Sequence, residues 1–277
     1  MTLSNRNAFF KAGIALSSLC LLIGIAASVA AIPVYAQMEA EMSLRPGGFF
    51  QALLARHFEA RLLAAHFAVL LLALYSLLAA AFILFFFEKT QAPEILFVAF
   101  FAVSFAPEVL RLALPLGRVF EIPSLYLLMA SRIILFGRYF GIFSLFAASV
   151  HAAGYQSQQQ REAIIIILAM ALFLALSVPV DTQAWDSSLA MVSGYGTMFR
   201  LIEIGIFLVT AASFFVAALP RGSCEFIFIG AGSVLAFLGR DVLLRADAWA
   251  GLPFGLLLLA AGTWLICVRL HRIYLWL

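Results

Sequence analysis

Residues 65–87 read AHFAVLLLALYSLLAAAFILFFF, a long run that contains no Asp, Glu, Lys or Arg. An α-helix rises about 1.5 Å per residue and the hydrocarbon core of a bilayer is about 30 Å thick, so the run is long enough to cross a membrane. Lipid offers the backbone no hydrogen-bond partners, so such a segment is expected to be helical. The run therefore predicts a transmembrane helix and decides the fold class.

Seven further apolar stretches have a similar character, and charged or turn-forming residues separate them. The predicted spans lie near 10–32, 65–87, 95–115, 123–149, 163–180, 197–219, 226–245 and 252–268. We therefore predict an all-α integral membrane protein, a polytopic helical bundle of about eight transmembrane helices.

The composition agrees with this prediction. Hydrophobic residues make up 65% of the 277 residues and charged residues 11%, whereas a soluble domain has about 25% charged residues. The mean hydropathy is +1.08. Little sequence remains between the spans, so residues 1–277 are expected to form a single transmembrane domain in the lipid bilayer. Most arginines fall inside apolar runs rather than on a polar surface, so nucleic-acid binding is not expected.

The first span has two interpretations. A basic start, an apolar run and Val34-Tyr35-Ala36 before Gln37 resemble a signal peptide with a cleavage site. The apolar stretch of about 20 residues is longer than the usual ~7–15 of such peptides, which favours a retained helix. Cleavage would leave seven spans with the N-terminus outside, a receptor-like topology.

The segment 49–64, FFQALLARHFEARLLA, is amphipathic. Its apolar residues recur at helical spacing, and its charged residues lie on another side. This pattern predicts an amphipathic helix at the outer membrane interface. A lid or docking surface on the outer side is the alternative.

The distribution of basic residues in short loops gives the orientation. With the N-terminus inside, the cytoplasmic segments hold Arg6, Lys11, Lys89, Arg161, Arg221, Arg269 and Arg272. The outer segments hold Arg45, Arg56, Arg61 and Arg118, with Arg245 at a border. This bias predicts a multi-pass protein of the cytoplasmic (inner) membrane with both termini in the cytoplasm.

A surplus of arginine within the spans is the main functional clue. Six arginines lie within or at the ends of predicted spans, namely Arg111, Arg132, Arg138, Arg200, Arg240 and Arg245. Three carboxylates accompany them: Glu108, Glu203 and Asp241. A charge in hydrocarbon is costly, so surplus cations need water, a polar cavity or a bound anion.

Spacing accounts for some of these charges. Three acid–arginine pairs share a helix face at i,i+3 or i,i+4: Glu108 with Arg111, Arg200 with Glu203, and Asp241 with Arg245. Arg132, Arg138 and Arg240 have no partner on their own helix at such spacing. Gly137 and Gly141 form a GxxxG pattern around Arg138, which favours close approach of another helix.

Two interpretations of the charged residues remain open. The functional one is a pocket on the extracytoplasmic side that binds an anionic lipid or solute, because the planar guanidinium contacts phosphate or carboxylate in bidentate fashion. Its candidate ligands to the anion are Arg132, Arg240, Arg111 and Arg200. The architectural one is charge pairing between helices through Glu108, Glu203, Asp241, Arg245 and Arg138.

The sequence contains few of the motifs that mark an enzyme. The sequence contains none of the motifs GxSxG, HExxH, Walker A or GxGxxG, and its histidines and cysteines have no metal-site spacing. No metal or cofactor is therefore expected. The first hypothesis is a non-catalytic receptor or sensor-like module, or a subunit of a membrane assembly. Signalling by such a module would need a membrane protein partner. The alternatives are an enzyme acting on a lipid phosphate, with Glu108, Glu203 or Asp241 as acid or base, and a small-solute transporter.

Overall fold

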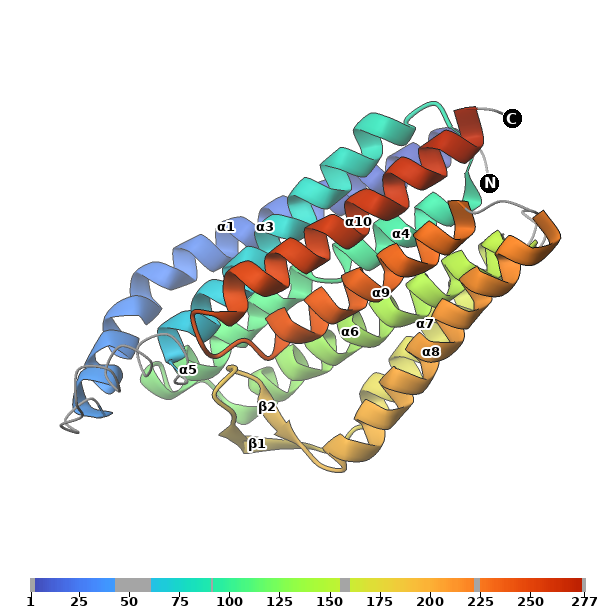
Figure 1. The fold of residues 1–277 in the computed structure, drawn as a ribbon. Coiled ribbons are helices and arrows are strands. Elements are labelled where there is room, and N and C mark those ends of the chain that lie inside the picture. Colours follow the sequence, from blue (N-terminus) through green and yellow to red (C-terminus); the bar gives the residue numbers. More distant parts are fainter. Residues whose placement is uncertain (1–2, 43–60, 91, 155–159, 222–224, 276–277) are drawn as a thin grey trace, which may run out of the picture.

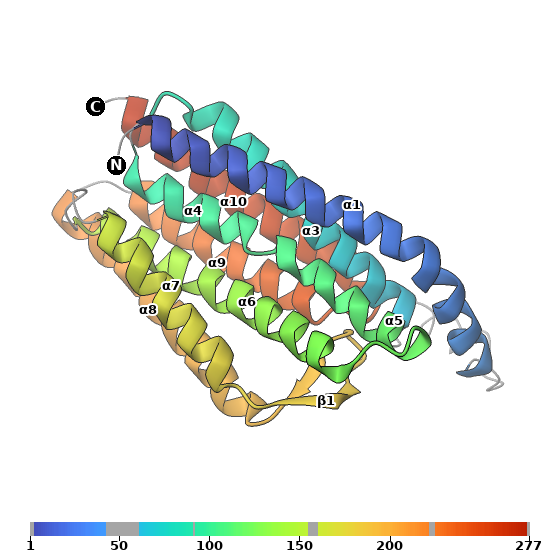
Figure 2. The same cartoon turned by 180° about the vertical axis from the view of Figure 1, so that it is seen from behind.

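The computed structural model describes residues 3–42, 61–90, 92–154, 160–221 and 225–275 (Figures 1 and 2). Its helices are α1 (Leu3–Met42), α3 (Leu62–Phe87), α4 (Pro93–Val103), the 3₁₀ helix η1 (Ala106–Leu112), α5 (Ala113–Val119), α6 (Ser124–Ala152), α7 (Gln160–Ser177), α8 (Gly196–Arg221), α9 (Glu225–Leu244) and α10 (Gly251–Leu275). The strands are β1 (Val180–Trp185) and β2 (Met191–Ser193).

The helical bundle predicted from the sequence is confirmed. Within the described residues, eight helices are long and apolar enough to cross a membrane, with Pro93–Gly117 counted as one crossing. The chain is therefore a multi-pass membrane protein.

Helix α6 lies in the interior of the bundle. It contacts α4 and η1 on one side and both α7 and α8 on the other, while α9 and α10 pair with each other and α1 covers α3. The N- and C-terminal ends lie together, and the strands lie at the opposite end of the bundle (Figure 1). We call these the termini end and the hairpin end.

Helices α9 and α10 pack at very short distance because glycines face each other. A Cβ atom at Gly239 would lie 2.3 Å from the backbone nitrogen of Leu259, and one at Gly262 would lie 2.4 Å from that of Ala236. Small residues at these positions let the two backbones approach, which gives the van der Waals contact that holds helices together in lipid.

The predicted third span, 95–115, is not one continuous helix. Helix α4 ends at Val103, and the chain continues as the 3₁₀ helix η1 and then as α5. The reason is Pro107, which has no N–H to donate to the carbonyl of Val103 and whose ring would clash with it. The backbone N–H of Glu108 instead donates to Phe105 O at 3.1 Å, the shorter 3₁₀ connection.

The GxxxG pattern of α6 lies against this break. A Cβ atom at Gly137 would lie 2.9 Å from the carbonyl oxygen of Ser104, and one at Gly141 would lie 2.3 Å from the Ser104 hydroxyl oxygen. The two glycines therefore let α6 approach the point where the third span bends. That approach brings Arg138, next to Gly137, close to Glu108.

Two further segments differ from expectation. The segment between the predicted spans 163–180 and 197–219 was not assigned to any helix or strand, and it contains an antiparallel hairpin in which Val180 pairs with Ser193 and Trp185 with Met191. Helix α1 is longer at both ends than the predicted 10–32. Residues 49–60 of the predicted amphipathic helix lie outside the described residues.

The α9–α10 contact can be tested with one methyl group. Gly239→Ala places a Cβ atom against backbone, which cannot move aside, so we expect a loss of about 1–3 kcal/mol in the free energy of unfolding in detergent. Gly205→Ala on α8 is the matched control, because a Cβ atom there meets nothing within 4 Å. Equal stability of the two variants would contradict the packing described here.

Candidate functional site

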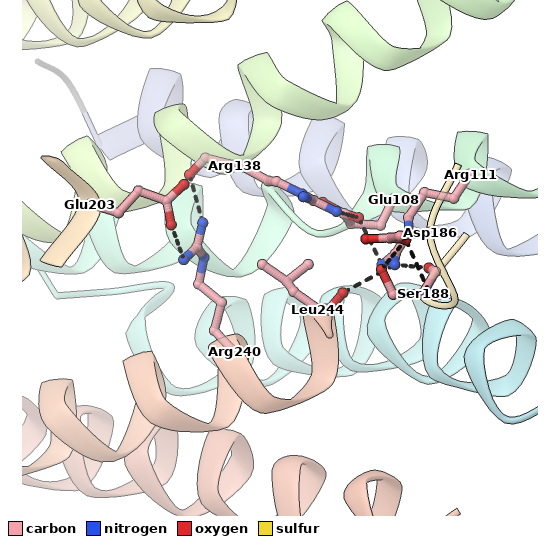
Figure 3. A network of polar contacts seen from close by, with 8 residues as sticks. All are labelled: Glu108, Arg111, Arg138, Asp186, Ser188, Glu203, Arg240 and Leu244. Atoms are coloured by element: carbon pink, nitrogen blue, oxygen red, sulfur yellow. Dashed lines mark hydrogen bonds and ion pairs between the residues drawn. The ribbon is translucent and has the colours of Figure 1, made fainter. Parts of the chain in front are cut away.

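Glu108 lies at the centre of a network of buried charges (Figure 3). Its side chain, on η1, is 1% exposed. Arg138 of α6 holds it in a bidentate pair, with Nε at 2.7 Å from Oε1 and Nη2 at 2.9 Å from Oε2. Arg111 adds a longer contact of 3.3 Å to Oε2. Short, forked, charge-assisted bonds of this kind are among the strongest in proteins, so Glu108 fixes the position of Arg138.

Arg111 connects the break in the third span to the hairpin end. Its Nη2 donates to the carbonyl oxygen of Ser188, in the turn between β1 and β2, and to that of Leu244 at 3.0 Å. Asp186 holds that turn, because its Oδ1 accepts from the Ser188 N–H at 3.0 Å and from the Ala190 N–H at 3.0 Å. The hairpin is thus joined to the last turn of α9 through Arg111.

Arg240 of α9 is 1% exposed and has long contacts. Among the described residues its hydrogen-bond partners are Glu203 Oε2 at 3.5 Å and the Arg138 carbonyl oxygen at 3.4 Å. Bonds between a guanidinium and a carboxylate are ordinarily about 2.7–2.9 Å long. The Phe237 ring lies 5.6 Å from the guanidinium carbon and adds a cation–π contact. Arg240 is therefore a buried cation that its neighbours compensate weakly.

Asp241 joins two more exposed arginines at the edge of the network. Arg245 Nη2 lies 2.9 Å from Asp241 Oδ1, and Arg200 Nη2 lies 3.9 Å from Oδ2. The side chain of Arg200 is 54% exposed and that of Arg245 is 43% exposed. These two arginines can change rotamer without disturbing the packed core.

A cavity of about 110 Å³ lies among these side chains. Residues of α6, α8, α9 and the hairpin line it, and its charged lining residues are Arg138, Arg200, Glu203, Arg240, Asp241 and Arg245. Four arginines and two carboxylates give the lining a formal charge of +2. The cavity lies at the hairpin end of the bundle, between the last turns of α9 and the first turns of α8.

Arg132 has a different position. Its Nη1 donates to the carbonyl oxygens of Ala175 at 2.6 Å and Val178 at 2.5 Å. The last carbonyls of a helix have no partner within the helix, so Arg132 caps the C-terminal end of α7. It is not among the described residues that line the cavity.

Two of the three ion pairs inferred from spacing are present, and the members of the third pair contact residues of another helix instead. Glu108 contacts Arg111, and Asp241 contacts Arg245. Glu203 contacts Arg240 instead of Arg200, whose carboxylate partner is Asp241. Spacing along one helix cannot reveal such pairs between helices. In the described part of the chain, no group of three or more His, Cys, Asp or Glu residues is arranged to hold a metal ion.

Sequence reasoning missed the contribution of the hairpin. Ser188 supplies a carbonyl to Arg111, and Ser193 lines the cavity. The sequence signal was the run Asp186-Ser187-Ser188, because Asp followed by such residues favours a turn closed by the Asp side chain.

Comparison with known proteins gives no further guidance: no protein-family model matches the chain, and no curated sequence is significantly similar to it.

The Glu108–Arg138 pair can be tested by a double-mutant cycle. Arg138→Gln leaves the buried carboxylate with the longer Arg111 contact, and we expect a loss of about 3–5 kcal/mol in the free energy of unfolding. Glu108→Gln and the double variant complete the cycle. The loss in the double variant should be smaller than the sum of the two single losses, because each single substitution removes the same ion pair. Denaturant titration in detergent measures all four proteins. Additive losses would mean that the pair is not coupled.

Proposed function

We propose that this protein is a non-catalytic membrane module that binds an anionic group in the cavity at its hairpin end, as a receptor, a sensor or a subunit of a membrane assembly. The proposal rests on the burial of Arg240 and on the length of its contacts. A guanidinium that is 1% exposed, with hydrogen bonds of 3.4 and 3.5 Å, lines a cavity shared with three other arginines.

The cavity suits an anionic group rather than a whole solute. At about 110 Å³ it is well below the ~300–1,000 Å³ of pockets that enclose a drug-sized ligand. Arginine stays charged when it is buried, and its planar fork matches the oxygens of phosphate or carboxylate. A bound anion would give Arg240 short contacts and would offset the surplus charge of the lining.

The bias of basic residues toward the termini end supports an orientation with both termini in the cytoplasm. In a cytoplasmic membrane the cavity would then lie on the extracytoplasmic side. Arg200 follows the first residue of α8 by four residues and Arg240 precedes the last residue of α9 by four, which places both about 6 Å from a helix end. This depth is close to the headgroup region, where a lipid headgroup or an outer solute could enter.

The engagement of the carboxylates favours binding over catalysis. Glu108, Glu203 and Asp241 each contact at least one arginine, so each is engaged in an ion pair within the protein itself. An enzyme acting on a lipid phosphate is the alternative in which one of them is nevertheless the acid or base. Loss of turnover on replacing one of them by Ala, with the fold intact, would favour that alternative.

The break in the third span favours a second candidate, a small-solute transporter. Transporters often form their binding sites at discontinuous helices near the middle of the membrane, and η1 interrupts the span next to Glu108. Uptake or efflux of a solute by proteoliposomes, lost on Arg240→Ala, would favour a transporter. If the protein is a binding or assembly module, we expect no solute flux. We also expect a membrane protein partner to co-purify with it under gentle extraction.

Binding can be measured with inorganic phosphate and sulfate as probes, by calorimetric titration of detergent-solubilised protein. Arg200→Gln and Arg245→Gln remove half-exposed side chains whose ion pairs contribute little to stability, so both variants should fold. Each variant should bind the anions about tenfold or more weakly, since a hydrogen bond to a charged group contributes about 1.5–3 kcal/mol.

Arg272→Gln is the matched control, because it removes an exposed arginine from the opposite, termini end. It should bind phosphate and sulfate as the wild type does. Equal weakening in the control would mean that overall charge attracts the anions, and no binding by the wild-type protein would refute the proposal.

A further inference from the structure

We infer that the cavity selects a phosphate monoester in its doubly charged form, and that this group enters by displacing Asp241 from Arg200 and Arg245. The inference rests on the proposed function and deepens it, because it names the chemical class of the bound group and the residue that competes with it.

The charge of the lining favours a dianion. A displaced Asp241 side chain is in water and no longer offsets the buried charge. The network then holds five arginines and three carboxylates, whose formal charges sum to +2. They are Arg111, Arg138, Arg200, Arg240 and Arg245, with Glu108, Asp186 and Glu203. A group with two negative charges therefore neutralises the network, whereas a group with one leaves a cation uncompensated in a partly buried site.

Asp241 is the carboxylate that can leave most easily. It is 29% exposed, against 18% for Glu203 and 1% for Glu108, and its contact with Arg200 is 3.9 Å long. A displaced Asp241 side chain can reach water, so its charge need not remain buried. Glu108 cannot leave, because Arg138 holds both of its oxygens.

The released arginines can then converge on one anion. All three arginines line the cavity: Arg200 and Arg245 are half-exposed and can rotate onto the anion, and Arg240 is buried beside it. A terminal phosphate presents three oxygens, one for each guanidinium. A phosphodiester has two substituted oxygens and a single charge, so it satisfies fewer donors and would need to fit two chains into a cavity of about 110 Å³.

Methyl phosphate and dimethyl phosphate test the class without changing the protein. The wild type should bind the monoester at least tenfold more tightly than the diester at pH 7. Affinity for methyl phosphate should rise about tenfold from pH 5 to pH 7, because the second pKa of a phosphate monoester is near 6. Affinity for sulfate, a dianion throughout this range, should stay constant. Equal affinity for the two esters would overturn the inference.

Asp241→Asn tests the displacement. The amide keeps the shape of the side chain and removes its competing charge, so we expect affinity for methyl phosphate and sulfate to increase about tenfold. Unchanged or weaker binding by the folded variant, beside a wild type that binds, would overturn the inference and leave the proposed function standing. A wild type that binds none of the four anions would overturn both.

A phosphate monoester can belong to a membrane lipid or to a soluble molecule, and binding in nanodiscs distinguishes these two sources. If the natural group is a lipid headgroup, discs that contain phosphatidic acid should abolish methyl phosphate binding, while discs of phosphatidylglycerol should not. If the natural group is a soluble phosphate, methyl phosphate should bind equally in both. Loss of binding in phosphatidylglycerol discs alone would contradict selection of a monoester.

Discussion

The bidentate pair between Glu108 and Arg138 is the contact on which the charged half of the bundle depends. A carboxylate at 1% exposure is tolerable in a membrane protein only if cations and hydrogen bonds surround it. Pro107 ends α4 and lies in the first turn of η1. Gly137 and Gly141 let α6 approach this break. The glycines, the proline and the ion pair are thus parts of one arrangement.

Placement of Arg138 determines what surrounds it. Its carbonyl accepts a long hydrogen bond from Arg240, and its side chain lines the cavity. On the other side of Glu108, Arg111 holds the hairpin turn and the end of α9. Because the carboxylates are taken up in holding helices together, too few remain to neutralise Arg240, Arg200 and Arg245. The same contacts that order the bundle leave a surplus of positive charge at its hairpin end, which is why architecture and anion binding need not exclude each other.

The sequence predicted the parts of the fold that hydrophobicity controls, because a run such as residues 65–87 has few alternatives in lipid. It predicted less where single residues act over distance. Pro107 was visible, but the sequence does not show that α6 packs against the break that this proline makes in residues 95–115. Arg132, like Arg240, has no carboxylate partner at helical spacing in the sequence, and the structure places it at the carbonyls that end α7. Glu203 exchanged the partner suggested by spacing for one on another helix, and pairing between helices leaves no periodic signal in one sequence.

A crystal structure of the protein with bound arsenate would show where an anion binds. Arsenate is a phosphate analogue, and its anomalous scattering locates it without bias. We expect an arsenic peak inside the cavity, with oxygens within hydrogen-bond distance of Arg240, Arg200 and Arg245, and with the Asp241 side chain turned toward solvent. An empty cavity at saturating arsenate, or arsenic bound only at the termini end, would contradict this expectation.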